Sequence, residues 1–224
     1  MERQSEADAA LLDRLYESPH FPEYVEELKA RLRREARQRR AFYEKITEDD
    51  KAEFINGEIV FHSPVNLRHL KAAKRLLVLM DAYVGRNDLG FVGYEKMLIA
   101  LSRNDYEPDI CYFGRDKADA FTPCQMRFPA PDLVVEVLSI STESRDRGVK
   151  FEDYAAHGVG EYWLVDPDTE TIEQYRLGDS GYELVMKSRS GEIESSVLAG
   201  FIIPVRAVFD EDSHRATLDA IRAA

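Results

Sequence analysis

The chain has 224 residues, of which 44% are hydrophobic and 32% are charged, an ordinary composition for a soluble globular protein. Its net charge of −12 argues against a protein that coats nucleic acid without specificity, because phosphate binding relies on clustered lysine and arginine. No run approaches 18 apolar residues, and the N-terminus lacks the basic and then apolar pattern of a secretory signal, so we expect a cytoplasmic protein with no membrane segment.

The first part of the chain has a helical pattern. Between residues 7 and 45, apolar side chains recur at spacings of three and four residues, with interruptions at Pro19 and Pro22. These side chains are Leu11, Leu12, Leu15, Tyr24, Val25, Leu28 and Leu32. This pattern predicts an N-terminal helical extension over residues 1–46.

The end of this extension is strongly basic. Residues 29–45 hold eight basic residues against two acidic ones, a local balance of +6 in an acidic chain. One interpretation is a solvated helical face; another is an arm that contacts phosphate, with Arg33, Arg34, Arg37 and Arg40 as the nucleic-acid-binding candidates. A further alternative is packing against a second subunit, which would make the protein a homodimer.

A β-rich domain over residues 47–212 is predicted to follow. The turn dipeptide Asn56-Gly57 between short β-prone runs indicates a hairpin over residues 54–61. An amphipathic helix is expected over 65–84, followed by strands over 91–101, 108–113 and 133–138.

The second half continues the mixed pattern. We expect a helix over 144–157 that ends at Gly158, a hairpin that pairs 162–165 with 171–176, and short strands over 182–186 and 194–198. A short C-terminal helix over residues 213–224 completes the chain. The fold class is α+β, or mixed α/β.

One carboxylate in this pattern is unusual. Glu136 is the only charged residue in the apolar run from Leu133 to Leu138, which is typical of a strand buried on both faces. An ionised carboxylate buried there costs several kcal/mol unless it is paired or binds a metal ion. Glu136 therefore needs a partner.

Two aspartates are candidates for that partner. Asp132 lies on the same strand, but four residues of strand separate the two Cα atoms by roughly 13 Å. Asp109 begins another predicted strand, and adjacent strands are only about 4.8 Å apart. Two facing carboxylates repel each other unless a cation or a proton lies between them, so a divalent metal ion is the simplest explanation.

Lys150 lies early in the helix that follows the Glu136 strand. Long helical side chains point back toward the helix N-terminus, here toward the end of that strand. Its ammonium could orient a water molecule or stabilise developing negative charge. The alternative is an ordinary pair within the helix, with Asp146 or Tyr154 four residues away.

With these residues in place, the chain resembles the Uma-type family, bacterial proteins of restriction-endonuclease-like fold within the PD-(D/E)XK nuclease superfamily. The resemblance covers about residues 47–210, and its most specific part is 131–167. It rests on Gly57-Glu58-Ile59-Val60, His69 on the next helix, Pro108-Asp109-Ile110, and the stretches Pro131 to Ser139, Arg145 to Lys150, and Gly158 to Pro167.

The resemblance implies a metal-dependent phosphodiesterase with a mixed β-sheet flanked by helices and additional β-hairpins. Asp109 and Glu136 would bind Mg²⁺ or Mn²⁺, Lys150 would be the catalytic lysine, and DNA would be the substrate. This chain departs from the superfamily pattern at one position. The usual lysine of the superfamily lies two residues after the acidic residue, where this chain has Leu138. The family pattern places the lysine on the following helix instead.

The same family pattern suggests additional site residues. Glu58 would be a further acidic ligand, or else an exposed strand residue, and His69 would contact phosphate or a carboxylate, or else lie on a helix surface. Tyr154 would hold Lys150, although a core tyrosine is the commoner case. The other histidines show no metal-ligand spacing and receive no role; these are His20, His62, His157 and His214.

Two other functions remain open at this point. The first is a catalytically silent module that binds nucleic acid or protein with the nuclease fold. The second is a hydrolase of smaller phosphoesters, which is disfavoured because the chain has no glycine-rich phosphate loop.

Overall fold

The computed structural model describes residues 2–223, and their side chains from residue 8 onward. Its helices are α1 Glu2–Tyr16, α2 Phe21–Lys45, α3 Leu67–Asn87, α4 Arg115–Ala118, α5 Glu143–Asp146, α6 Val149–Ala156, α7 Arg206–Phe209 and α8 Glu211–Ala223. Its strands are β1 Ala52–Ile55, β2 Glu58–Phe61, β3 Gly90–Tyr94, β4 Leu98–Ala100, β5 Asp105–Tyr106, β6 Ile110–Gly114, β7 Arg127–Phe128, β8 Leu133–Val137, β9 Glu161–Asp166, β10 Thr171–Gly178, β11 Gly181–Ser188, β12 Glu192–Glu194 and β13 Ile202–Pro204. Among these residues, no helix combines the length and the apolar character that crossing a membrane requires.

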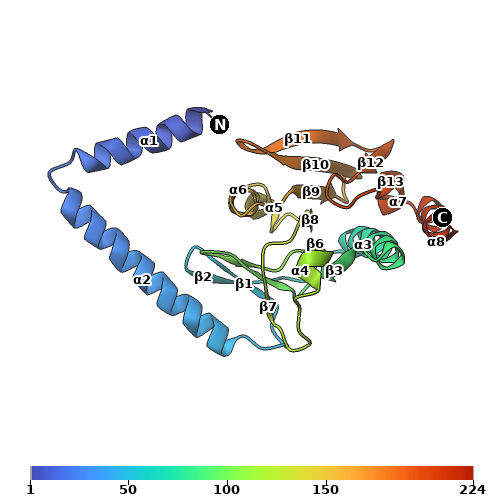
Figure 1. The fold of residues 1–224 in the computed structure, drawn as a ribbon, viewed down its shortest axis with the longest axis horizontal. Coiled ribbons are helices and arrows are strands. Elements are labelled where there is room, and N and C mark those ends of the chain that lie inside the picture. Colours follow the sequence, from blue (N-terminus) through green and yellow to red (C-terminus); the bar gives the residue numbers. More distant parts are fainter. Residues whose placement is uncertain (1, 224) are drawn as a thin grey trace.

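The strands form two main sheets, which lie one above the other in Figure 1. The smaller sheet has the order β2-β1-β5-β4-β7, and the larger has the order β11-β10-β9-β8-β6-β3. The larger sheet is mixed, because β8 runs parallel to β9 and antiparallel to β6. Helices α5 and α6 form the crossover that a parallel pair such as β8 and β9 requires. The strands β12 and β13 form a separate small pair.

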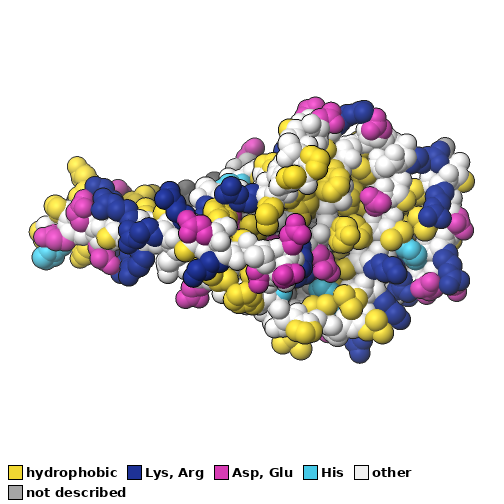
Figure 2. Space-filling model, turned by 90° about the horizontal axis from the view of Figure 1, so that it is seen from below, with side chains coloured by type: hydrophobic (Ala, Val, Ile, Leu, Met, Phe, Trp, Pro, Cys, Tyr) yellow, Lys and Arg dark blue, Asp and Glu magenta, His cyan; other side chains and the backbone are white. Residues whose placement is uncertain are grey.

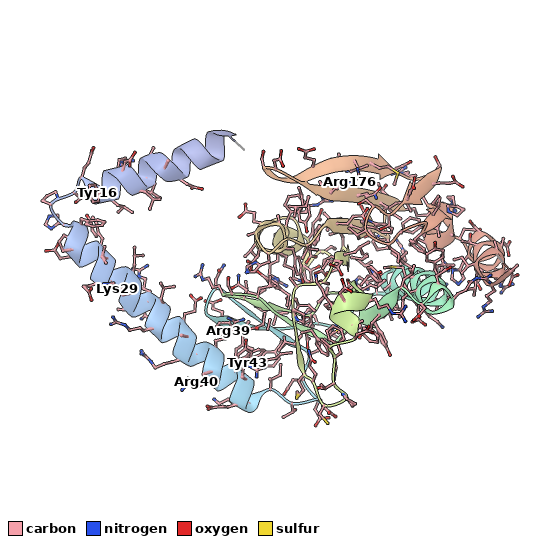
Figure 3. All side chains as sticks on the ribbon, in the orientation of Figure 1. Tyr16, Lys29, Arg39, Arg40, Tyr43 and Arg176 are labelled. Atoms are coloured by element: carbon pink, nitrogen blue, oxygen red, sulfur yellow. The ribbon has the colours of Figure 1, made fainter. Side chains whose placement is uncertain are left out.

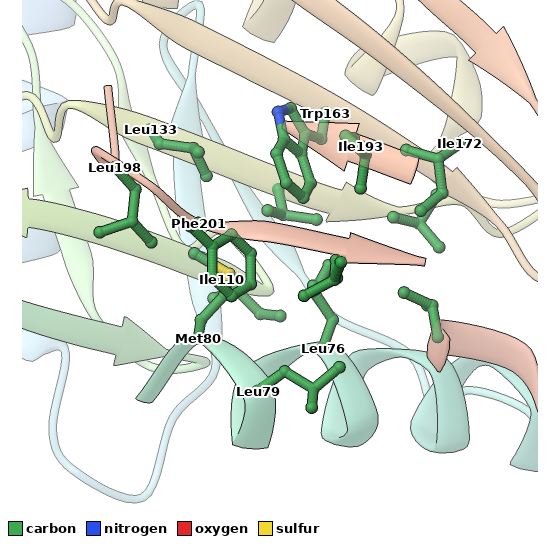
Figure 4. Close-up of a cluster of buried hydrophobic side chains, with 14 of the residues drawn as sticks. Leu76, Leu79, Met80, Ile110, Leu133, Trp163, Ile172, Ile193, Leu198 and Phe201 are labelled. Carbon is green, nitrogen blue, oxygen red and sulfur yellow. The ribbon is translucent and has the colours of Figure 1, made fainter. Parts of the chain in front are cut away.

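One face of the larger sheet packs against α3, α7 and the β12–β13 pair. Figure 4 shows this core, in which Leu76, Leu79 and Met80 of α3 lie below Trp163 and Phe201. Trp163 is fully buried and stacks on Phe201, with the ring centroids 6.5 Å apart. The prediction of a buried strand over 133–138 is confirmed, since every residue of β8 is buried.

The other face of the larger sheet packs against α6 and the smaller sheet. Side chains alternate between faces along a strand, so Leu133, Val135 and Val137 enter the first core, while Val134 and Leu138 enter the second. Glu136 shares the face of Val134. The backbone of β8 therefore directs the Glu136 carboxylate into the space between the sheet, α6 and the smaller sheet.

The predicted Asn56-Gly57 hairpin is confirmed, since β1 and β2 pair across that dipeptide with positive φ at both residues. The single strand predicted over 91–101 is wrong. The chain forms β3 in the larger sheet, turns at Glu95 with a φ of 39°, and enters the smaller sheet as β4.

Two further predictions needed correction. The helix expected over 144–157 is divided into α5 and α6 at Arg147-Gly148, where the Gly148 backbone (φ −114°, ψ −107°) is not helical. The strand expected over 194–198 lies earlier, as β12, and ends at Glu194. It does not continue because the backbone N–H groups of Val197 and Leu198 bond to the Ser195 hydroxyl instead of a neighbouring strand.

Helix α2 is attached to the smaller sheet through its last turns. Arg39 donates two hydrogen bonds of 2.7 Å to the buried carboxylate of Asp105 in β5, and Tyr43 donates a third of 2.6 Å. Phe42 packs beside these groups in a small apolar cluster with Phe54 of β1. In Figure 3, Arg39 and Tyr43 point from α2 toward the sheet, while Arg40 points away from it.

This attachment predicts a measurable difference between two neighbouring arginines. Arg39→Ala leaves the Asp105 carboxylate buried without its counter-ion, which is expected to lower the free energy of unfolding by about 3–5 kcal/mol. Arg40→Ala removes an exposed charge and is expected to change it by less than about 0.5 kcal/mol. Urea unfolding of the two variants measures both values, and equal losses would contradict a specific role for the Arg39–Asp105 pair.

Candidate functional site

The candidate site is a cavity of about 470 Å³ between the two sheets. The link between β5 in the smaller sheet and β6 in the larger sheet is the segment Glu107-Pro108-Asp109, and both acidic residues line the cavity. Glu136 of β8 and Lys150 of α6 line it from the other side. The three residues for which a catalytic role is expected from the sequence, Asp109, Glu136 and Lys150, thus line one cavity.

Asp109 is held in place by two donors. Its Oδ2 accepts a hydrogen bond of 2.8 Å from the backbone N–H of Val137, next to Glu136, and lies 3.4 Å from His69 Nε2. Partial burial by itself would raise the pKa of Asp109, but His69 and the Val137 N–H outweigh this effect and hold the pKa below its ordinary value. Asp109 is therefore a carboxylate at neutral pH.

Lys150 lies at the centre of a buried group of carboxylates. Its Nζ is 2.8 Å from Glu53 Oε1, 3.1 Å from Glu136 Oε1 and 3.3 Å from Asp146 Oδ1. Burial by itself would lower the pKa of Lys150, but Glu136, Glu53 and Asp146 outweigh it and hold this pKa well above its ordinary value. Lys150 thus pairs with Asp146 of the preceding short helix α5 and also reaches Glu136 of β8.

The carboxylates around Lys150 are in excess. Burial raises the pKa of Glu136 well above its ordinary value, and the charges of Asp146, Asp109 and Glu53 add to this rise against the effect of Lys150. Burial likewise raises the pKa of Asp146, although Lys150 and a hydrogen bond from Thr142 oppose the rise. One ammonium does not neutralise this group, so the cavity attracts further positive charge.

Glu53, Glu107 and His62 are additional site residues for which the sequence interpretation gave no role. Burial, followed by the charge of Glu53, raises the pKa of Glu107 to about 7. Glu107 Oε2 is buried and has no hydrogen-bond partner among the described residues. His62 Nε2 lies 3.6 Å from Glu53 Oε2. Glu53 had a signal in the sequence, since it is a lone carboxylate in the apolar strand Ala52–Ile55; His62 had none.

The three additional candidates from the family pattern have different positions. His69 is buried beside Asp109, in the first turn of α3, where the Asn66 side chain accepts a hydrogen bond from its backbone N–H. Tyr154 is a core residue between Tyr106 and Tyr162, and in the described part of the chain its hydroxyl makes no hydrogen bond, so it does not hold Lys150 through one. Glu58 is exposed on β2 and does not line the cavity.

Two positions that compete with these residues have structural roles. Asp132 accepts hydrogen bonds from the Gly114 backbone N–H and from Lys117, and does not line the cavity. Leu138, which occupies the usual lysine position, packs in the second core with 7% of its surface exposed. The ammonium therefore enters the cavity from α6 and not from β8.

The four candidate arginines of the basic segment lie on α2, outside the cavity. Arg33, Arg34, Arg37 and Arg40 are exposed, and none forms a salt bridge within residues 8–223. The neighbouring cations differ, since Lys29 pairs with Glu26 and Arg31 pairs with Glu27. Together with the exposed Lys45, these four residues hold the free positive charge of the segment.

The cavity has suitable donor chemistry for a hard divalent cation. Asp109, Glu136 and Glu107 supply carboxylate oxygens, the ligands that Mg²⁺ prefers, and Glu107 Oε2 is a buried acceptor with no donor in residues 8–223. No three His, Cys, Asp or Glu side chains in the described chain are already arranged as a complete ligand set. Metal binding would therefore need side-chain movement in the cavity.

Comparisons with known proteins identify a family for this chain. A family model named Uma2, with the description "Putative restriction endonuclease", matches residues 39–206. The matched segment holds every cavity residue discussed above and begins at Arg39, so it leaves out α1 and most of α2.

Two proteins of Synechocystis, both described as uncharacterized, are similar in sequence. One is 31% identical over 154 residues, which are 66% of this chain and 86% of that protein. The other is 30% identical over 151 residues, which are 64% of this chain and 75% of that protein.

A crystal structure from Anabaena variabilis, described as a putative nuclease belonging to DUF820, has a similar fold. The TM-score is 0.65 at 18% sequence identity, with 79% of this chain and 96% of that chain covered.

Proposed function

The chain belongs to the Uma2 family and has a restriction-endonuclease-like fold, and we propose that it is a metal-dependent endonuclease that hydrolyses phosphodiester bonds of DNA. The proposal rests mainly on the cavity between the two sheets, which is lined by Asp109 from the β5–β6 link, Glu136 from β8 and Lys150 from α6. The predictions of the family and of the mixed α+β fold are confirmed by these comparisons.

The residues of the cavity would have different roles in the reaction. Asp109 and Glu136, with Glu107, would hold Mg²⁺ or Mn²⁺, which when bound activates water and neutralises charge on a phosphate oxygen. His69 and the Val137 N–H both contact Oδ2 of Asp109 and so hold this carboxylate in place. Lys150 would stabilise the negative charge that develops on the phosphate as the bond breaks.

A second candidate function is a silent binding module that keeps the nuclease fold. The position of the Lys150 ammonium favours it, because the ammonium already forms close contacts with Glu53, Glu136 and Asp146. In that case Lys150 would serve as the permanent counter-ion of the buried carboxylates, and no divalent cation would be needed.

Cleavage of supercoiled plasmid DNA separates the two functions. The purified protein is incubated with Mg²⁺, with Mn²⁺ and with a chelator, and nicked and linear products are measured. We expect products only with a divalent cation, whereas DNA binding without any metal-dependent cleavage would favour the silent module. An RNA of the same sequence, tested in parallel, shows which nucleic acid is cleaved.

The basic face of α2 is proposed to contact the phosphates of the substrate outside the cavity. Its four unpaired arginines form a local concentration of positive charge in an acidic protein.

We also propose that the chain is divided into a helical extension over 1–46, a nuclease domain over 47–212 and a C-terminal helix over 213–224.

This contact predicts a change in the salt dependence of binding. Arg33→Ala/Arg37→Ala should weaken DNA binding and reduce the slope of log K against log salt by about 0.9 for each lost phosphate contact. Arg215→Ala/Arg222→Ala on α8 removes the same charge elsewhere and is the matched control. Fluorescence anisotropy over a salt series measures both slopes, and equal slopes for the two variants would contradict the contact.

A further inference from the structure

Helix α2 has an apolar face that is only half covered. Toward its C-terminal end, Phe42 and Tyr43 pack on the smaller sheet. The preceding turns continue the same pattern with Tyr24, Leu28 and Leu32, which are 41%, 52% and 59% exposed. Positions 28, 32, 35, 39 and 42 follow one another at spacings of three and four residues, so they lie on one side of the helix. Half of this side therefore extends beyond the sheet without a covering layer in the described chain.

Helix α1 adds a second uncovered apolar surface. Leu11, Leu12 and Tyr16 are 54%, 65% and 73% exposed. The two helices touch near the turn between them, where the rings of Tyr16 and Phe21 are 5.3 Å apart, and then diverge as the open arm seen in Figures 1 and 3. Figure 2 shows this arm projecting from the rest of the molecule, with hydrophobic and basic side chains along it. Such a surface marks an interaction site.

The arm is an addition to the shared fold. The family match begins at residue 39, so the exposed apolar residues of α1 and α2 all lie outside it. An isolated helix of this length is marginal in water and gains most of its stability from packing. The cavity and its carboxylates do not touch these residues. The surface thus needs a partner that the nuclease domain of the same chain does not supply.

The charges along α2 indicate which partner fits. Its first eight residues carry Glu23, Glu26 and Glu27 and no basic residue. The following twelve residues carry seven basic residues and one acidic residue, Glu35. Two copies of this helix side by side in opposite directions would place the acidic end of each next to the basic middle of the other. Two copies in the same direction would place like charges together, which costs free energy.

From these observations we propose that the arm binds a second copy of this chain, with the two α2 helices antiparallel and Leu28 and Leu32 at their contact. The contact uses the apolar side of α2, which continues into Phe42 and Tyr43. Arg37 and Arg40 do not share this side, so they stay available to DNA in the dimer.

The oligomeric state of the full chain tests the proposal. Light scattering and sedimentation equilibrium should give twice the monomer mass for the wild type at micromolar concentration. Leu28→Glu/Leu32→Glu should associate at least about 100-fold more weakly, because two leucines of each copy lose their burial. Leu184→Glu changes an equally exposed leucine of β11 and should leave the dimer intact.

Circular dichroism shows whether the arm variant keeps its helices and its fold. A monomeric wild type would overturn the proposal. That result would mean that α1 closes on α2 within one chain, or that a different protein is the partner. A dimer that Leu28→Glu/Leu32→Glu does not weaken would overturn it as well, as would a dimer that only Leu184→Glu disrupts.

Cysteine cross-linking tests the direction of the pair. Chains with Val25→Cys and chains with Leu32→Cys are mixed, both with the exposed Cys124 changed to serine, while the buried Cys111 is kept. The two positions are about 10 Å apart along α2, further than a disulfide can span. An antiparallel pair centred on Leu28 should give mixed cross-links between positions 25 and 32. Cross-links only between identical positions would show a parallel pair and overturn the proposed geometry.

Discussion

Asp109→Asn and Glu136→Gln are each expected to reduce metal-dependent cleavage of DNA by at least about 100-fold. Changes that only disturb the surroundings of a metal ligand cost about 10–100-fold in affinity or activity, and these changes remove a ligand itself. Glu58→Gln is the matched control, because Glu58 is an exposed carboxylate outside the cavity. Cleavage assays and calorimetric titration with Mn²⁺ measure rate and metal affinity for the three variants.

The stability of these variants distinguishes a lost function from a lost fold. The pKa of Glu136 is raised by burial and by the neighbouring carboxylates, so its charge destabilises the folded protein at neutral pH. Glu136→Gln removes this charge and should keep or increase the free energy of unfolding in a chelator. Inactive variants that are also unfolded would leave the metal role without support, and a fully active Asp109→Asn would contradict it.

Lys150→Met is expected to affect both stability and cleavage. It leaves Glu53, Glu136 and Asp146 buried without their ammonium, and removing one partner of a buried ion pair costs about 3–5 kcal/mol. It should also slow cleavage by about 10²–10³-fold while DNA binding persists, as for other groups that stabilise a transition state. Lys71→Met, an exposed lysine of α3, is the control.

The stability loss should depend on pH in a defined direction. Lys150 lowers the pKa values of Glu136 and Asp146, which are raised by burial, so its removal raises both pKa values further. A carboxyl group with a raised pKa in the folded state binds protons that the unfolded chain releases, so its contribution to stability is lost as pH rises. The deficit of Lys150→Met should therefore be larger near pH 8 than near pH 5. Urea unfolding at both pH values measures it, and a constant deficit would argue against the carboxylate group as its cause.

The central residues of the site could be predicted because their signals are local. Glu136 is a charge in an apolar strand, and Lys150 lies in the helical segment α5–α6 that follows this strand, so one strand-to-helix unit contains both. Glu53 carried the same signal in β1. Its contact with Lys150 depends on how the smaller sheet packs on the larger one, which no short sequence pattern encodes.

The positions of Glu107 and His62 depend even more on long-range packing. Glu107 enters the cavity because β5 and β6 belong to different sheets, and His62 approaches Glu53 across the β1–β2 hairpin. The division of the strand expected over 91–101 has a local cause, the turn at Glu95. The sequence does not reveal this turn, because glutamate is not a residue type that commonly adopts positive φ. The hairpin at Asn56-Gly57 was predictable because asparagine and glycine are the residue types that most readily adopt positive φ.

Helix α2 is attached to β5, and only a very short stretch of chain separates this attachment from the acidic residues of the cavity. Asp105, which holds Arg39, is four residues from Asp109 and two from Glu107. If DNA or a second subunit favours one position of α2, any strain on β5 alters the placement of both acidic residues. Thermodynamic reciprocity then requires that a cation in the cavity change the affinity of the arm by the same factor. Titrating the protein with Mn²⁺ in the presence and in the absence of a DNA duplex would measure that factor. Equal Mn²⁺ affinities in the two titrations would show that the arm and the cavity act independently.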